Sequence, residues 1–292
     1  VLWRNDNWQQ QLPEAARRGI MTTDDLACDL MPARAGDGAA VARLLTMIQR
    51  PTTLPLTVWS SPLAGRFVED VIQGSEPALG MRFYTIKVEG QIEGAICLRF
   101  TDGRVFVDNI YVSPRLRRQQ MTAYFLRESI LLYLREFEAP EAAWDVWAHE
   151  RALIAWHKQH GGVEQYRKSW FSISLPESGG AASLVQGLED AHDRHRRYGF
   201  SSIKVVTNRG SYTVGMLASH AFRVTDASSI NDPEFLPALA SIDGKRAVLV
   251  YSESTGIPEG ASVIASAIRM HAPMKPLFAN LEKHIPTKGF AR

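Results

Sequence analysis

The chain has 292 residues, of which 45% are apolar and 22% are charged, and 33 basic residues against 31 acidic ones give a net charge of +2. This composition is typical of an ordinary globular protein and excludes a disordered chain or one that finds partners through a strong overall charge. The longest apolar run, Ile130–Leu134, is far shorter than the ~20 residues that span a membrane. We therefore expect no membrane partner. The two cysteines, Cys28 and Cys97, form no disulfide framework and favour a reducing, cytoplasmic location.

The first half of the chain alternates helix and strand signals. Residues 1–29 are predicted to be a short helical leader, because Pro13 is suited to begin a helix and Gly19 to end it. Apolar spacings of three, four and seven positions predict helices over about 37–49, 63–72, 119–137 and 151–160. β-rich runs and turn pairs such as Asp102-Gly103 predict strands over 83–88, 91–100, 104–112, 143–148 and 166–175. The order predicts an α+β fold with a mixed, mainly antiparallel sheet flanked by helices.

A second unit is predicted after a linker. Residues 176–183 contain Pro176 and the pair Gly179-Gly180, which are typical of a connecting segment. Beyond them, residues 184–292 read as a smaller α+β domain without a recognisable catalytic pattern. Helices are predicted over 184–198, 235–239 and 275–284, and strands over 203–206, 212–217, 247–251 and 261–268. This domain is a candidate surface for a protein partner.

Residues 30–175 resemble a divergent member of the GNAT superfamily of N-acetyltransferases. Four segments, in the family's order and spacing, carry the resemblance: Met31–Asp37, Ile92–Ile96, Asn109–Pro114 and His149–Gly161. They are similar to the opening strand and helix, the third strand, the fourth strand ending V-x-P, and the "N-x-x-A" segment of the family. The resemblance implies transfer of an acyl group from acetyl-CoA or another acyl-CoA to an amine, which the sequence does not identify.

The same resemblance implies a set of coenzyme A-binding residues. In the family, glycines of an R/Q-x-x-G-x-G/A loop let backbone amides approach the pyrophosphate at a helix N-terminus. In this sequence the implied cofactor-binding residues are Val112, Arg117, Arg118, Gln119, Gln120 and Thr122. Gln120 and Thr122 stand where the family has glycine, and glycine or alanine, so a turn with a purely structural role is the alternative interpretation.

The implied catalytic residues also depart from the family. Trp156 stands where a tyrosine commonly protonates the leaving thiolate, and an indole N–H is no usable acid. Tyr166 is the candidate acid in its place, with His157 and His160 as alternatives. Asp108 is the candidate base that deprotonates the amine, although an ordinary surface carboxylate is the commoner explanation. Trp156 itself is expected to be a buried core aromatic.

Other functions remain open at the level of sequence. Loss of the glycines and the tyrosine is compatible with a silent GNAT scaffold in a larger assembly, such as a bacteriophage particle. The basic runs Arg115–Arg118 and Arg194–Arg197 keep a nucleic acid partner open, because some phage members of the superfamily modify DNA bases. The histidine pairs His157/His160 and His192/His195 lack completing ligands, so we expect no metal.

Overall fold

The computed structural model describes residues 20–23, 26–76, 78, 80–177, 184–244, 246–252 and 260–285. Its strands form one 13-stranded sheet in the order β1-β2-β3-β4-β5-β6-β13-β7-β12-β11-β10-β9-β8. The strands are β1 Ile20–Thr23, β2 Leu26–Pro32, β3 Arg82–Val88, β4 Gln91–Thr101, β5 Arg104–Val112, β6 Glu141–Trp147, β7 Val163–Ile173, β8 Leu184–Gln186, β9 Ser201–Val206, β10 Ser211–Leu217, β11 Ala221–Val224, β12 Ala247–Ser252 and β13 Ser262–Pro273. The helices are α1 Gly38–Met47, α2 Ala64–Ile72, α3 Pro114–Arg118, α4 Met121–Tyr133, α5 Arg151–Gln159, α6 Leu188–Tyr198, α7 Phe235–Asp243 and α8 Met274–Glu282, with short 3-10 turns η3 Leu54–Leu56, η4 Val58–Ser60 and η5 Ala227–Asn231.

The sheet is mixed and mainly antiparallel, which confirms the predicted fold class. Among the described strands, only β5/β6 and β11/β12 pair in parallel. The strands predicted over 83–88, 91–100, 104–112 and 143–148 are all present within a few residues of their predicted bounds. No helix in the described part of the chain is long and apolar enough to cross a membrane.

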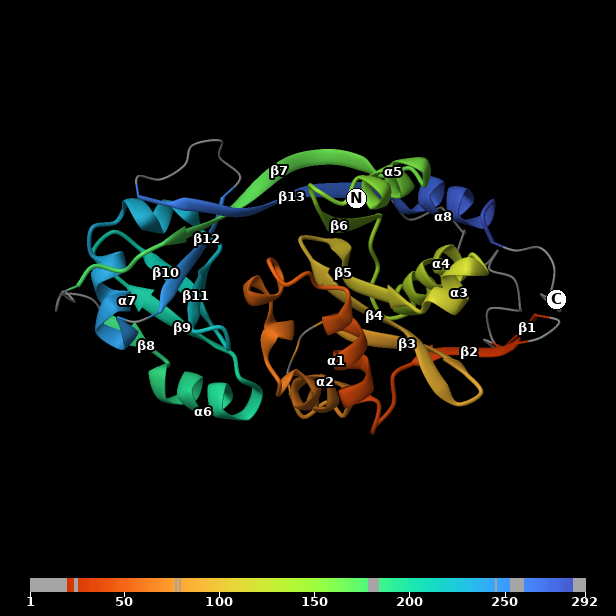
Figure 1. The fold of residues 1–292 in the computed structure, drawn as a ribbon, viewed down its shortest axis with the longest axis horizontal. Coiled ribbons are helices and arrows are strands. Elements are labelled where there is room, and N and C mark those ends of the chain that lie inside the picture. Colours follow the sequence, from red (N-terminus) through yellow and green to blue (C-terminus); the bar gives the residue numbers. More distant parts are fainter. Residues whose placement is uncertain are drawn as a thin grey trace.

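The same strand order occurs twice in the sheet. β2 to β6 lie side by side in chain order, antiparallel until the last pair, and β8 to β12 repeat this arrangement. The long strands β7 and β13, which follow β6 and β12, pair with each other along their length. Figure 1 shows them running side by side between the two ends of the molecule, which we call the first lobe (β2–β6) and the second lobe (β8–β12). The two halves of the chain are thus structural repeats, which the sequence alone does not reveal.

The repeats exchange their last strands. β7 comes from the first half of the chain but pairs with β12 of the second lobe, and β13 comes from the second half but pairs with β6 of the first lobe. The pair Ser169–Ser266 lies near the middle of the β7/β13 ladder, and the two hydroxyls are 3.1 Å apart. Because of this exchange, the sheet runs without a break through both lobes.

The first lobe has a core on each side of the sheet. On one side α4 and α8 pack against the strands, with Phe125, Ile130, Met270, Leu277 and Leu281 almost fully buried. On the other side α1 and α2 cover β3 and β4 (Figure 1). α8 follows β13, so the end of the chain supplies part of the first core.

The segments before β3 and after β5 differ from their predictions. Residues 1–19 and 24–25 of the predicted helical leader lie outside the described residues, and residues 20–23 and 26–29 of it form β1 and the start of β2 instead of helix. The helix predicted over 119–137 is α4, which begins at Met121 and ends at Tyr133. The short helix α3 before it was not predicted, and Gln120, in a left-handed conformation with φ +59°, separates the two. A helix cannot continue through such a residue.

Most predicted elements of the second unit are present, although their connections were not foreseen. Residues 184–186 form β8 before α6 begins, and β11 was missed because it has only four residues. Residues 178–183 of the predicted linker lie outside the described residues. The strand predicted over 261–268 extends to Pro273 and lies in the first lobe, because its inward residues Ile268 and Met270 are buried there.

Candidate functional site

An opening in the first lobe begins at a bulge in β5. β5 and β6 pair in parallel only from Val105 to Val107, and beyond that point the described residues of β5 pair with β4 alone. The register of β4 and β5 shifts at the same place, between the pairs Cys97/Asn109 and Leu98/Val107. One extra residue, Asp108, therefore lies in β5. A bulge bends its strand, and here the bend coincides with the separation of β5 from β6.

The turn from β5 into α4 contains a left-handed residue of the kind that glycine usually provides, although it contains no glycine. Ser113 caps α3 by accepting a hydrogen bond from the Leu116 amide, and Gln120 then takes the left-handed conformation. Such a conformation costs a residue with a side chain about 1 kcal/mol or more relative to glycine. No side chain in the described structure caps α4, so the amides of Met121 and Thr122 are directed out of its first turn.

The basic residues of this turn face solvent. Arg117, Arg118 and Gln120 are exposed, and Gln119 and Thr122 are half-buried. Val112 is buried and pairs with Gly94 of β4. Free helix amides beside two guanidinium groups are suited to bind a diphosphate.

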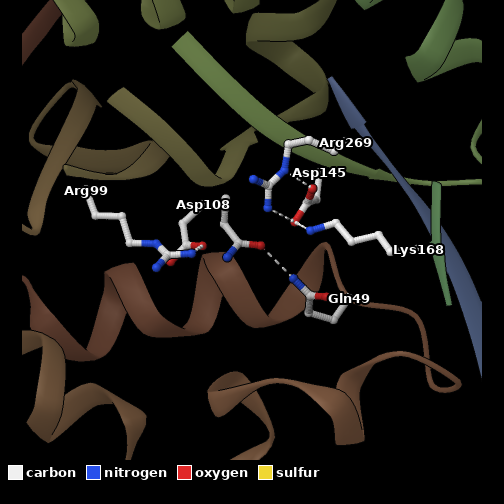
Figure 2. A network of polar contacts seen from close by, with 7 residues as sticks. Gln49, Arg99, Asp108, Asp145, Lys168 and Arg269 are labelled. Carbon is white, nitrogen blue, oxygen red and sulfur yellow. Dashed lines mark hydrogen bonds and ion pairs between the residues drawn. The ribbon is translucent and has the colours of Figure 1, made fainter. Parts of the chain in front are cut away.

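The side of the sheet opposite α4 carries a network of charged residues at the opening (Figure 2). Asp145 of β6 accepts hydrogen bonds from Lys168 of β7 at 2.7 Å and from Nε and Nη2 of Arg269 of β13 at 2.6 and 3.1 Å. The Lys168 side chain is only 3% exposed and that of Arg269 16%. Burial acts to lower the pKa of Arg269, but the hydrogen bonds and charge of Asp145 raise it overall. We call this side of the sheet the inner face.

Asp108 lies on the inner face with its own cationic partner. It forms an ion pair with Arg99 of β4 at 3.3 Å, and its side chain is 28% exposed. The guanidinium groups of Arg99 and Arg269 lie over the ring of Phe106, at 4.6 and 4.7 Å from its centre. Nearby, Gln49 after α1 donates to the Asn109 side chain at 2.7 Å. Asp108 is thus a partly buried carboxylate in a polar network rather than an ordinary surface residue.

Tyr166 belongs to the same face. It pairs with Arg269 across the β7/β13 ladder, and the guanidinium of Arg269 lies 5.6 Å from its ring centre. Its phenol is an O–H donor on the inner face. The structure therefore brings Asp108 and Tyr166 to one face of the sheet, on either side of Arg269.

Trp156 was predicted to be mostly buried against the sheet or the helix over 119–137, and it does pack, partly buried, against the core that contains α4. Leu153, which was expected to share its apolar face, is instead 42% exposed. His157 and His160 are more deeply buried beside Trp156. His157 stacks on Trp144 at a ring distance of 4.7 Å, and His160 packs on Trp156 at 4.2 Å. The two histidines are packing residues, and no group of three or more potential metal-ligand side chains converges anywhere in the described structure.

The buried histidine predicts a loss of stability in acid. Burial lowers the pKa of His157 from 6.5 to about 3, and the nearby His160 adds to this effect. Since the unfolded chain then binds the proton more readily, stability is complete above about pH 6.5 and falls as the pH is lowered towards 3, by about 2 kcal/mol at pH 5 from this residue. Replacing His157 by Phe should flatten the pH dependence of urea unfolding between pH 7 and 5, whereas replacing the more exposed His149 by Gln should not. An equal slope in wild type and His157→Phe would contradict this.

Sequence analysis did not single out Asp145, the hydrogen-bond acceptor at the centre of the network, or its donors Lys168 and Arg269. Asp145 lies in the predicted strand 143–148, between the buried Trp144 and Val146. Strand alternation alone places it on the face opposite to those two side chains. Lys168 and Arg269 were not foreseen because the β6/β13/β7 pairing joins residues far apart in the chain.

The corresponding turn of the second lobe is acidic. η5 and α7 connect the parallel strands β11 and β12, as α3 and α4 connect β5 and β6. This turn carries Asp226, Asp232 and Glu234. Asp232 already accepts hydrogen bonds from Thr207 and Tyr212. Carboxylates at this position disfavour a diphosphate, so of these two described turns the one in the first lobe has the suitable charge.

Comparison with known proteins supports the fold. No protein-family model matches the sequence, and no curated protein matches it either. Among solved structures, a tandem GNAT protein from the clavulanic acid biosynthesis pathway is similar at 12% identity and a TM-score of 0.56, over 85% of this chain and 99% of that one. A GCN5-related N-acetyltransferase from Sphaerobacter thermophilus is similar at 15% identity and a TM-score of 0.53, over 85% and 96%. A putative acetyltransferase from Pyrococcus horikoshii is similar at 12% identity and a TM-score of 0.54, over 86% and 90%. The chain therefore has a GNAT fold, strongly diverged in sequence.

Proposed function

We propose that the protein is an N-acyltransferase that takes an acyl group from an acyl-CoA at the opening between β5 and β6. The observation that carries the proposal is the left-handed turn at Gln120. It leaves the first amides of α4 without a side-chain cap, beyond the end of the β5 segment that does not pair with β6. The second lobe offers no equivalent, so the proposal places one acyl-CoA on each chain.

The residues of this turn fit a coenzyme A diphosphate. Arg117 and Arg118 supply positive charge, and the amides of Met121 and Thr122 supply donors at a helix N-terminus. Gln120 already has the conformation that glycine takes in such loops, and its side chain is exposed. The edge of β5 near Val112, which faces away from β4, has no strand partner in the described structure and is free to bind the pantetheine arm.

The inner face supplies groups for proton transfer. Acyl-CoA, when bound, supplies the thioester. Asp108, at the bulge where the opening begins, would accept the proton of the attacking amine, while the ion pair with Arg99 fixes the position of its carboxylate. Tyr166, with Arg269 beside it, would donate a proton to the leaving thiolate in the role that Trp156 does not fill. The amine reaches this face because α4 and α8 fill the opposite side of the sheet.

Coenzyme A binding is the direct test. We expect acetyl-CoA to bind with a Kd in the micromolar range, which corresponds to about −8 kcal/mol. Replacing both Arg117 and Arg118 by Gln should weaken binding at least tenfold, because two charged partners of the diphosphate are lost. Replacing Gln120 by Gly should tighten binding and also raise the free energy of unfolding by roughly 1 kcal/mol. Isothermal titration calorimetry and urea unfolding measure these effects.

The matched control is Arg167→Gln on β7, whose side chain is 72% exposed. It removes one positive charge outside the turn and should leave the affinity unchanged. If neither wild type nor Gln120→Gly binds acetyl-CoA at millimolar concentration, the turn is structural. The chain would then be a GNAT scaffold without this chemistry, acting through protein contacts.

A further inference from the structure

Arg223 of β11 is a guanidinium without a protein partner on the inner face. Its neighbours in the sheet, Leu249 of β12 and Gly215 of β10, are apolar. The described structure contains no hydrogen bond or ion pair of its side chain, although the residue is half-buried. An arginine in such surroundings normally has a carboxylate or a backbone acceptor. A missing partner points to a ligand.

Gly215 keeps one side of this arginine open. A Cβ atom added there would lie 3.4 Å from Cβ of Arg223 and 3.6 Å from its Nε. Any larger side chain at position 215 would therefore cover the guanidinium. The glycine leaves its donors accessible from the neighbouring strand.

The charged groups that face Arg223 come from the first lobe. Burial lowers its pKa, Asp108 acts in the opposite direction, and Arg99 adds to the lowering. Asp108 is already paired with Arg99 at 3.3 Å. Arg99 also has a buried Nε that makes no hydrogen bond. Asp108 is thus already used by Arg99, and the positive charge of Arg223 is left without an ion-pair partner in the described structure.

We propose that Arg223 binds a carboxylate or phosphate group of the acyl acceptor, so that the substrate is an amine that also carries an anionic group. This rests on the proposed acyl transfer, since Asp108, the candidate base, faces the same guanidinium. The proposal places the anionic end of the acceptor at Arg223 and its amine towards Asp108. A planar guanidinium binds either anion through two parallel hydrogen bonds, which lysine cannot form.

The test uses inorganic phosphate and succinate as probes, so that the two anion chemistries are compared. Phosphate also fits the Arg117/Arg118 turn, and both titrations are therefore made with full-length Arg117→Gln/Arg118→Gln protein. We expect at least one probe to bind there with a millimolar or lower Kd. Adding Arg223→Gln should remove this binding, and Arg223→Lys should weaken it about tenfold. Adding Arg167→Gln should leave it unchanged.

A second variant covers the case in which Arg223→Gln does not fold. Asp108→Asn removes the carboxylate that competes for the guanidinium and should tighten binding of the same probe several-fold. The proposal is overturned if neither probe binds. It is also overturned if Arg223→Lys and Asp108→Asn each leave the affinity for the probe unchanged. Acetyl-CoA binding to otherwise wild-type Arg223→Gln or Arg223→Lys, whichever folds, should be unchanged. Failure of both probes to bind, with acetyl-CoA binding intact, therefore refutes this inference alone. Failure of wild type to bind acetyl-CoA refutes the acyl transfer instead.

Discussion

Replacing Asp145 by alanine is expected to destabilise the protein by about 3 kcal/mol. Asp145 is the shared acceptor of Lys168 and Arg269, whose side chains are 3% and 16% exposed. Removing one member of a buried ion pair typically costs roughly 3–5 kcal/mol, because a charge remains without compensation. We expect the lower end of that range, since the Asp145 side chain retains 32% exposure. Urea unfolding followed by circular dichroism measures the change.

The control for this prediction is Asp193→Ala on α6. Asp193 also pairs with an arginine, Arg196, but its side chain is 70% exposed. Exposed pairs contribute about 0–1 kcal/mol, so this variant should unfold nearly as wild type does. Combining Asp145→Ala with Lys168→Met should recover part of the loss, because the buried ammonium is then absent as well. A cost of Asp145→Ala no greater than that of Asp193→Ala would show that the network does not stabilise the fold.

A chain that ends at residue 177 is expected not to fold, although it contains all of the sequence that resembles the GNAT superfamily. It lacks β13, so β6 loses its partner strand on that side. It also lacks Ile268, Met270, Leu277 and Leu281, which are at most 2% exposed in the core beneath α4. Each such side chain contributes about 1.5–3 kcal/mol on burial, and four of them approach the whole stability of a typical domain, about 5–15 kcal/mol.

Co-expression provides the matching experiment. A second chain of residues 184–292 supplies β13 and α8, and we expect the two fragments to associate and recover the near-ultraviolet circular dichroism of the intact protein. Cooperative unfolding of the fragment 1–177 alone would contradict this prediction. It would show that β13 adds to a first lobe that is already complete.

Individual helices, strands and turns could be predicted because the residues that specify them are neighbours in the sequence. The Asp102-Gly103 pair specified the β4/β5 hairpin, and Pro51 correctly indicated that α1 ends before it. Gln120 could not be read in the same way. A glutamine gives no signal of a left-handed conformation, and the helix prediction therefore ran through it.

The residues of the candidate site could be predicted only where a single segment of the sequence places them there. Asp108 and Tyr166 were singled out by their places relative to the resemblance, and both lie on the inner face. Their catalytic roles stay predictions. Asp145 and Arg269 come together only through strand pairing between distant segments, and no spacing within one segment indicates such pairing.

The exchange of β7 and β13 also sets the order in which the molecule is completed during synthesis. β6 ends at Trp147, but the strand that covers its edge does not begin until Ser262. At roughly 5–20 residues per second on the ribosome, the edge of β6 and the core beneath α4 wait on the order of ten seconds for their partner. An uncovered strand edge of this kind is a template for pairing with other chains. We therefore expect the newly made first half to be open to such pairing until the end of the chain arrives.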